Sequence, residues 1–316
     1  MATPPPPVNL WTVLSESKRI INAHSRHFLA LSVLFLLPNS FCIALYPSVS
    51  RLITPSDNQP PRADPDYKTT VLLLTAYVVI ITVFNLLAIG SIVYSVFQGF
   101  YGRPVKFISA MKSSFASFFP LLATLITTNS IVLGIFLVLG FYGFLLKTLI
   151  EIIIPGLEIS FLAFLVIVMI ISSIIVIKFQ LDWYLSWIIV VVESVWGLTP
   201  LKRSKSLTKG MKIASLSIIF FFAIAQLPLW WINNAAASIP IENGRFWTIV
   251  YFVFQIVIAS AFLMFSMLYH LAATTVMYVY CKVHHGEVDS ERNYVSLPFD
   301  DDGKVQHLVS VAHNNV

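Results

Sequence analysis

Residues 193–212 read ESVWGLTPLKRSKSLTKGMK and form the most basic segment of the chain, between two long apolar blocks. On a helical wheel at about 100° per residue, one arc is cationic and the other is small or apolar. The cationic arc holds Lys202, Arg203, Lys205, Lys209 and Lys212. The other arc holds Leu201, Ser204, Leu207, Thr208 and Met211. This division is typical of a helix in a membrane interface beside anionic headgroups. Alternatively, the lysines only stop translocation, and both interpretations place the segment in the cytosol.

The composition is that of a polytopic membrane protein. Hydrophobic residues make up 57% and charged residues 11% of the 316 residues, with a mean hydropathy of +0.82, whereas soluble domains contain about 45–50% apolar residues. The net charge of +5 does not indicate a nucleic-acid partner, because the basic residues cluster at the ends of apolar blocks, as the positive-inside rule predicts. Cys42 and Cys281 are too few for a disulfide framework.

Six apolar blocks are long enough to cross the roughly 30 Å hydrocarbon layer as helices. We expect them near Phe28–Tyr46, Thr69–Phe97, Phe115–Leu146, Ile159–Val192, Ile213–Ala237 and Trp247–Tyr280. The third and fourth exceed the length of one untilted helix, and we expect one span from each. Basic amphipathic helices are predicted at Leu10–His27, Gln98–Ser114 and 193–212. The predicted fold is an all-α membrane protein of six transmembrane helices, arranged as three hairpins that each follow a cytosolic amphipathic interfacial helix.

The predicted membrane domain covers 10–281, after a proline-rich flexible lead at 1–9 and before a polar tail at 282–316 that we expect to be disordered. The pattern of lead-in, span, short loop and span recurs at about 10–97, 98–192 and 193–281, which predicts an internal repeat. Cytosolic termini would place most of the 20 Lys and Arg residues on the cytosolic side. The positive-inside rule favours that orientation. The loop from Pro47 to Lys68 is then predicted on the opposite face.

Part of the basic segment resembles a known motif. Its residues are Glu193, Leu201, Arg203-Ser204, Leu207 and Lys209-Gly210. They resemble the E...AL(K/R)RS..L.(K/R)G signature of the glycerophosphodiester-phosphodiesterase membrane-domain superfamily. The proline-rich start and the YVSLPFD tail are similar to uncharacterised plant multi-pass proteins of that superfamily. Its bacterial enzymes carry a separate soluble catalytic barrel, and we expect none here. The resemblance therefore implies the six-span module without phosphodiesterase activity.

Three ionisable residues within the apolar blocks are candidates for an intramembrane polar site, because such groups are costly to desolvate. Lys178 and Asp182 lie four residues apart, and we expect them to pair on one helix face, either as a functional site or as a mutually neutralising pair. His270 is predicted to be a hydrogen-bonded packing residue. Glu193 is expected at the interface, accepting hydrogen bonds from Ser or Lys side chains. Only His284-His285, beside Cys281, could ligate a metal, and we expect neither metal nor cofactor.

Two functional classes follow. The first is a non-enzymatic scaffold or adaptor that binds anionic headgroups through its cytosolic helices and protein partners through its tail. The alternative is a transporter or lipid-handling protein with a polar site around Lys178 and Asp182. In the tail, the segment from Tyr294 to Leu297 resembles the tyrosine-based signals that clathrin adaptors bind as extended peptides; alternatively, the tail is simply unstructured. We expect cytosolic termini and an endomembrane (ER or Golgi) or plasma-membrane location, and the oligomeric state is open.

Overall fold

The computed structural model describes residues 9–53, 67–153, 160–237 and 246–287, and every secondary-structure element within these ranges is helical. Six of its helical stretches are long and apolar enough to cross a membrane. They are Ser25–Pro47, Thr70–Phe100, Phe107–Ile153, Phe161–Glu193, Lys212–Asn234 and Val250–His284. The prediction of an all-helical chain with six apolar spans is therefore confirmed for the described residues.

The first apolar block begins after a short lead-in helix and contains a π-helical turn. The order is α1 (Leu10–Ala23), α2 (Ser25–Leu31), the π-helix η1 (Ser32–Leu36) and α3 (Leu37–Ile53). The Leu37 N–H donates to the Ser32 carbonyl five residues back. The turn is thus widened just before Pro38, which has no N–H to donate. Pro47 lies inside α3, so the prediction that a loop begins there was wrong.

The second predicted lead-in is not a separate helix. Helix α4 covers Tyr67–Phe100, and α5 covers Phe107–Ile153 without interruption. Only Tyr101–Lys106 separates them, with Gly102 at a φ of 62° that favours glycine. The lead-in prediction was wrong because the basic stretch after this turn is continuous with the apolar run that follows. At 47 residues and about 1.5 Å per residue, α5 is about 70 Å long.

The fourth apolar block is broken into two helices, α6 (Phe161–Asp182) and α7 (Ser186–Glu193). The expectation of one span from this block agrees with the single candidate span Phe161–Glu193, but that span is not one uninterrupted helix. With eight residues, α7 is about 12 Å long and too short to cross the bilayer. The break at Trp183–Leu185 thus adds no crossing. Helices α8 (Leu198–Thr208), α9 (Lys212–Ala237) and α10 (Phe246–His284) follow.

The helix predicted across 193–212 is shorter in the structure, because a turn precedes it and another follows it. Glu193 closes α7, and the chain then turns through Ser194 and Gly197, at φ values of 54° and 73°. Gly210, at a φ of 95°, turns the chain again between α8 and α9. A Cβ atom disfavours positive φ, so glycine, which has none, is favoured at positions 197 and 210. Only Leu198–Thr208 is helical between these turns.

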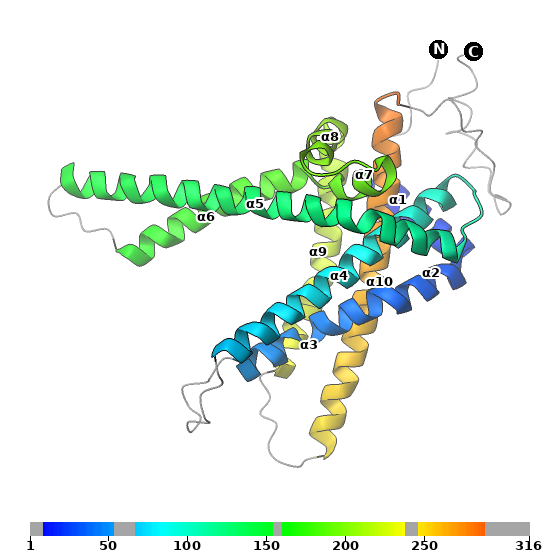
Figure 1. The fold of residues 1–316 in the computed structure, drawn as a ribbon, viewed down its shortest axis with the longest axis horizontal. Coiled ribbons are helices and arrows are strands. Elements are labelled where there is room, and N and C mark those ends of the chain that lie inside the picture. The colour runs from blue at the N-terminus through cyan, green and yellow to red at the C-terminus, as the bar shows by residue number, and fades with distance from the viewer. Residues whose placement is uncertain (1–8, 54–66, 154–159, 238–245, 288–316) are drawn as a thin grey trace.

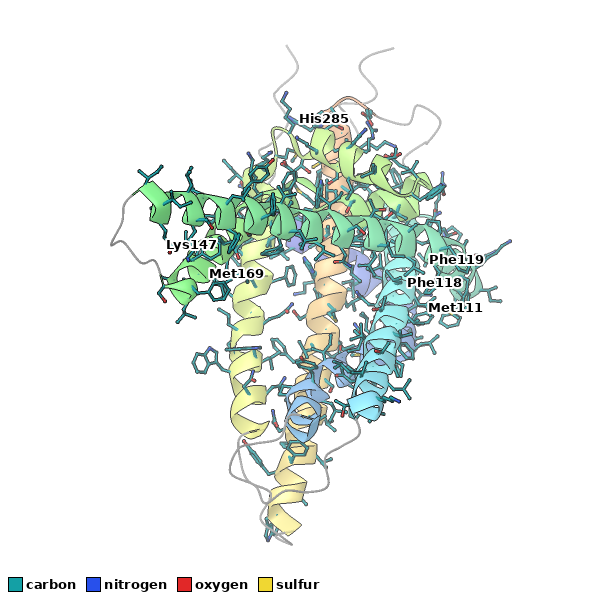
Figure 2. All side chains as sticks on the ribbon, turned by 60° about the vertical axis from the view of Figure 1, so that its left-hand side comes forward. Met111, Phe118, Phe119, Lys147, Met169 and His285 are labelled. Carbon is teal, nitrogen blue, oxygen red and sulfur yellow. The ribbon has the colours of Figure 1, made fainter. Side chains whose placement is uncertain are left out.

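Helices α3, α4, α9 and α10 form one bundle (Figure 1), in which α3 contacts α4, α9 and α10. The α8 segment, the end of α4 and the end of α10 lie at one end of this bundle. Helix α5 crosses α4 and α7 there and then projects sideways with α6. We call residues 129–153 and 161–181 the arm. Figure 2 shows that it extends away from α9, with Lys147 and Met169 labelled on its two helices.

The core lies where the bundle meets α7. Leu185, Ile188 and Ile189 of this short helix and its N-cap are at most 1% exposed. They belong to one cluster of buried residues that also includes Phe28 and Tyr278. Within the arm, in contrast, large apolar side chains of both helices are exposed along the length. An apolar helix exposed on most sides is what hydrocarbon surroundings favour.

Candidate functional site

Helix α8 lies over the break between α6 and α7 and closes it through Ser204. The fully buried Ser204 hydroxyl donates to the Asp182 carbonyl at 2.8 Å and accepts the Leu185 N–H at 3.1 Å. These two backbone groups would otherwise lack partners at the break, and an unsatisfied buried group costs about 1–3 kcal/mol. Leu201 and Leu207 are buried on the same side of α8, whereas Lys202 and Lys205 are exposed. Ser204 thus fixes how α8 sits on the core.

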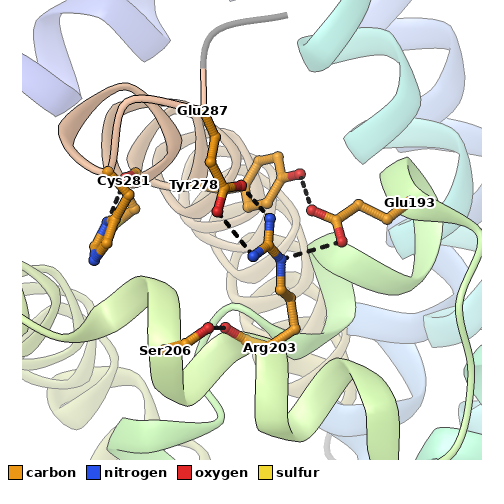
Figure 3. A network of polar contacts seen from close by, with 7 residues as sticks. Glu193, Arg203, Ser206, Tyr278, Cys281 and Glu287 are labelled. Atoms are coloured by element: carbon orange, nitrogen blue, oxygen red, sulfur yellow. Dashed lines mark hydrogen bonds and ion pairs between the residues drawn. The ribbon is translucent and has the colours of Figure 1, made fainter.

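Arg203 joins three helices through a network that we call the Arg203 clasp: Glu193, Arg203, Tyr278 and Glu287 (Figure 3). Its Nη1 donates to Glu287 Oε1 at 2.9 Å, and Nη2 contacts the other carboxylate oxygen of Glu287. Its Nε lies 3.5 Å from Glu193 Oε2. Tyr278 completes the clasp by donating its hydroxyl to Glu193 Oε1 at 2.8 Å. The clasp connects the end of α7, the middle of α8 and the end of α10.

The clasp places two carboxylates on one guanidinium. The hydrogen bonds between Arg203 and Glu287 raise the pKa of Arg203 and hold the pKa of the Glu287 carboxyl below its ordinary value of 4.5. The two side chains are 33% and 35% exposed, so water screens the pair and limits its contribution to stability. A bidentate guanidinium–carboxylate contact also fixes direction, which a lysine could not do. Arg203 therefore orients α10 on α8.

Asp182 pairs with a different lysine from the one that we predicted. Its Oδ1 accepts a hydrogen bond from Lys212 Nζ at 2.6 Å, and the Asp182 residue is only 4% exposed. Lys178 is exposed and forms no ion pair within the described residues. The predicted Lys178–Asp182 pair was wrong because the α8 turn brings Lys212, 30 residues away in sequence, to the end of α6. This leaves Lys178 as a cation on an apolar helix.

His270 lies in a small polar cluster inside the bundle. Its Nε2 is 3.4 Å from the hydroxyl of Tyr184, which in turn lies 2.8 Å from the Thr274 hydroxyl. The His270 ring is 4.9 Å from the Phe222 ring. These contacts fit the predicted role of a hydrogen-bonded packing residue. The structure does not bring His270 together with Lys178 into one site.

The described residues contain no group of three or more His, Cys, Asp or Glu side chains that could hold a metal ion. His285, just after α10, instead has its Nδ1 2.9 Å from the carbonyl of Cys281. The predicted sorting residues Tyr294 and Leu297 lie outside the described ranges.

Residues 7–296 match the family model described as Domain of unknown function (DUF8558). The chain belongs to this family. The matched region contains every described helix and all four residues of the Arg203 clasp. Comparisons with curated proteins and with solved structures gave no match.

In this DUF8558 member, sequence reasoning missed two residues of the clasp. Tyr278 carries no local signal, because a tyrosine on an apolar span is ordinary. Glu287 stands beyond the last span in a segment that we predicted to be disordered, although α10 reaches His284 and Glu287 itself is described. The resemblance motif did contain Glu193, Arg203 and Ser204, the three positions whose side chains hold α7, α8 and the break together.

Proposed function

We propose that the chain is a non-enzymatic membrane scaffold or adaptor whose α8 lysines bind anionic lipid headgroups. The observation that carries this proposal is the division of the basic segment into two groups. Arg203 and Lys212 are occupied by carboxylates. Lys202 and Lys205 on α8, and Lys209 at its C-cap, are exposed and have no ion pair within the described parts of the chain. Free ammonium groups on a fixed helix are suited to phosphate oxygens.

The orientation of the spans and termini is proposed to follow from the position of α8 at the membrane surface. With α8 at a cytosolic membrane surface, the ends of α4 and α10 face the cytosol as well, and both termini are cytosolic. The six spans then form three hairpins in an endomembrane or the plasma membrane, with interfacial helices before the first and the third. Protease treatment of sealed vesicles tests the orientation: the tail beyond Lys282 is expected to be digested. Protection of that tail would overturn it.

The superfamily resemblance of the basic motif remains a proposal, as does protein binding through the tail. The alternative function is a transporter or lipid-handling protein with a polar site around Lys178 and Asp182. The contacts of Asp182 weaken this alternative. The two residues do not form the site that it requires, because Asp182 binds Lys212.

Headgroup binding is tested with the purified full-length protein in nanodiscs of phosphatidylcholine and phosphatidylserine. A photoreactive group on the serine headgroup would label α8, and the sites would be mapped by mass spectrometry. Near-surface lysines contribute about 1 kcal/mol each, so replacing Lys202, Lys205 and Lys209 by Gln is expected to reduce α8 labelling by about two orders of magnitude. Unchanged labelling would leave these lysines with only a topogenic role.

A matched control removes the same charge at the same end of the bundle. Arg103, Lys106 and Lys112 are exposed at the turn between α4 and α5 and at the start of α5. Replacing these three by Gln is expected to leave headgroup labelling of α8 intact. Loss of α8 labelling in both variants would show that only net charge matters, and would contradict a site on α8.

A further inference from the structure

Helix α6 carries a feature that headgroup binding at α8 does not use. A shallow, open groove of about 410 Å³ lies on one face of α6. It is lined by Leu165, Val166, Met169, Ile170, Ser173 and Ile174. Five of these six side chains are apolar, and all six residues are exposed. The groove thus presents hydrocarbon to whatever surrounds the arm.

Lys178 stands at one end of this groove. It lies four residues after Ile174, so the two side chains occupy neighbouring turns of one helix face. Side chains on a helix lean toward its N-terminus, which directs the Lys178 stem back over Ile174 and toward the groove. No ion pair within the described residues neutralises its ammonium group.

The next turn of α6 does not compensate this charge. Asp182 is nearly buried and already bound to Lys212, whose own side chain is 53% exposed. Lys178, Asp182 and Lys212 together carry one net positive charge at the end of the groove. An uncompensated ammonium group within an apolar span is costly unless an anion or water reaches it. The charge therefore favours an anionic ligand with an apolar portion.

From the shared chemistry of the groove and the cation, we propose that α6 binds one anionic phospholipid. The headgroup phosphate contacts Lys178, and an acyl chain lies along the groove. From Leu165 to Lys178 the helix rises about 20 Å. An acyl chain that fills one leaflet of the hydrocarbon layer is about 15 Å long, which is shorter than this rise. One acyl chain therefore fits along the groove while its phosphate reaches Lys178. This site is separate from α8 and does not depend on headgroup binding there.

The test uses the full-length protein, extracted in mild detergent from membranes that contain phosphatidylcholine and phosphatidylglycerol. Native mass spectrometry measures the ratio of retained anionic to zwitterionic lipid, and a phosphatidylglycerol with a photoreactive acyl chain reports contact with α6. Replacing Lys178 by Gln is expected to lower the retained ratio about fivefold, the factor that corresponds to one near-surface lysine. Replacing Lys178 by Arg, which keeps the charge, is expected to preserve the ratio.

Two further variants separate the groove from general charge. Ile170→Trp, which fills the groove at an exposed position, is expected to reduce photolabelling of α6 while Lys178 remains. Lys147→Gln removes a lysine of the arm that already pairs with Glu151 at 2.9 Å, and is expected to change neither readout. An unchanged lipid ratio in Lys178→Gln, or photolabelling of α6 that Ile170→Trp leaves intact, would overturn the proposal. Occupation of the groove by a co-purifying protein helix instead of lipid would overturn it as well.

Discussion

Loss of the Arg203 side chain is expected to loosen the end of α10, and the buried thiol of Cys281 provides a way to measure this. Arg203→Met removes the contacts to Glu287 and Glu193 and leaves two carboxylates near each other. Partly exposed ion pairs contribute about 0.2–1 kcal/mol each, and the bidentate geometry places Glu287 at the upper end of that range. The expected loss is about 1–2 kcal/mol, a factor of about 5–30 in the opening equilibrium.

Cys281 lies three residues beyond Tyr278 on α10 and is fully buried. Replacing Cys42 by Ser leaves Cys281 as the sole cysteine, since the sequence has two. In that background, the rate of Cys281 modification by a thiol reagent in detergent reports opening of the end of α10. Arg203→Met is expected to raise this rate by the factor given above.

The matched control is Lys202→Met, which removes the neighbouring exposed charge without breaking a clasp contact. It is expected to leave the rate unchanged. A double-mutant cycle with Glu287→Gln then isolates the pair, because two changes that break the same contact are not additive. Equal rates for Arg203→Met and Lys202→Met would refute the clasp as the element that holds the end of α10.

Three further outcomes are expected. Ser204→Ala leaves buried backbone groups at the α6–α7 break unsatisfied and should lower the free energy of unfolding in detergent by about 1–3 kcal/mol, whereas the exposed Ser206→Ala should change it little. Because Arg203 lowers the pKa of Glu287 from 4.5, the Arg203–Glu287 contact contributes fully above that value and is lost as pH falls through the lower native pKa. The rate of Cys281 labelling, divided by the rate for a free thiol at the same pH, should therefore rise only below about pH 4.5, and Glu287→Gln should abolish this rise. Tyr294→Ala should redistribute the tagged protein, expressed at native level, between secretory compartments and the plasma membrane without lowering its abundance; an unchanged distribution would remove the sorting hypothesis.

The positions of the six spans could be predicted because each depends on a local property, a run of apolar residues long enough for the bilayer. Their ends could not, because backbone details override composition there. Pro47 is tolerated inside α3, and the basic start of α5 continues into an apolar helix where we predicted a boundary. Helix α6 ends at Asp182, with Trp183 as its C-cap, inside a block that we predicted as one span. That break depends on Ser204 of a later helix to satisfy the backbone.

The ion pairs of the candidate site could not be predicted from the sequence either. Spacing along a helix can propose only neighbours such as Lys178 and Asp182, whereas the structure pairs Asp182 with Lys212 and Arg203 with Glu287, across 30 and 84 residues. These long-range pairs show that the cations of the basic segment do not all have the same role. A count of positive charge treats all of its cations alike, but those with carboxylate partners hold helices together. Lys202, Lys205 and Lys209 have no carboxylate partner among the described residues and, like Lys178, remain available to phosphate. Neutralising the carboxylate-bound cations and the unpaired cations in separate variants would distinguish folding from lipid binding.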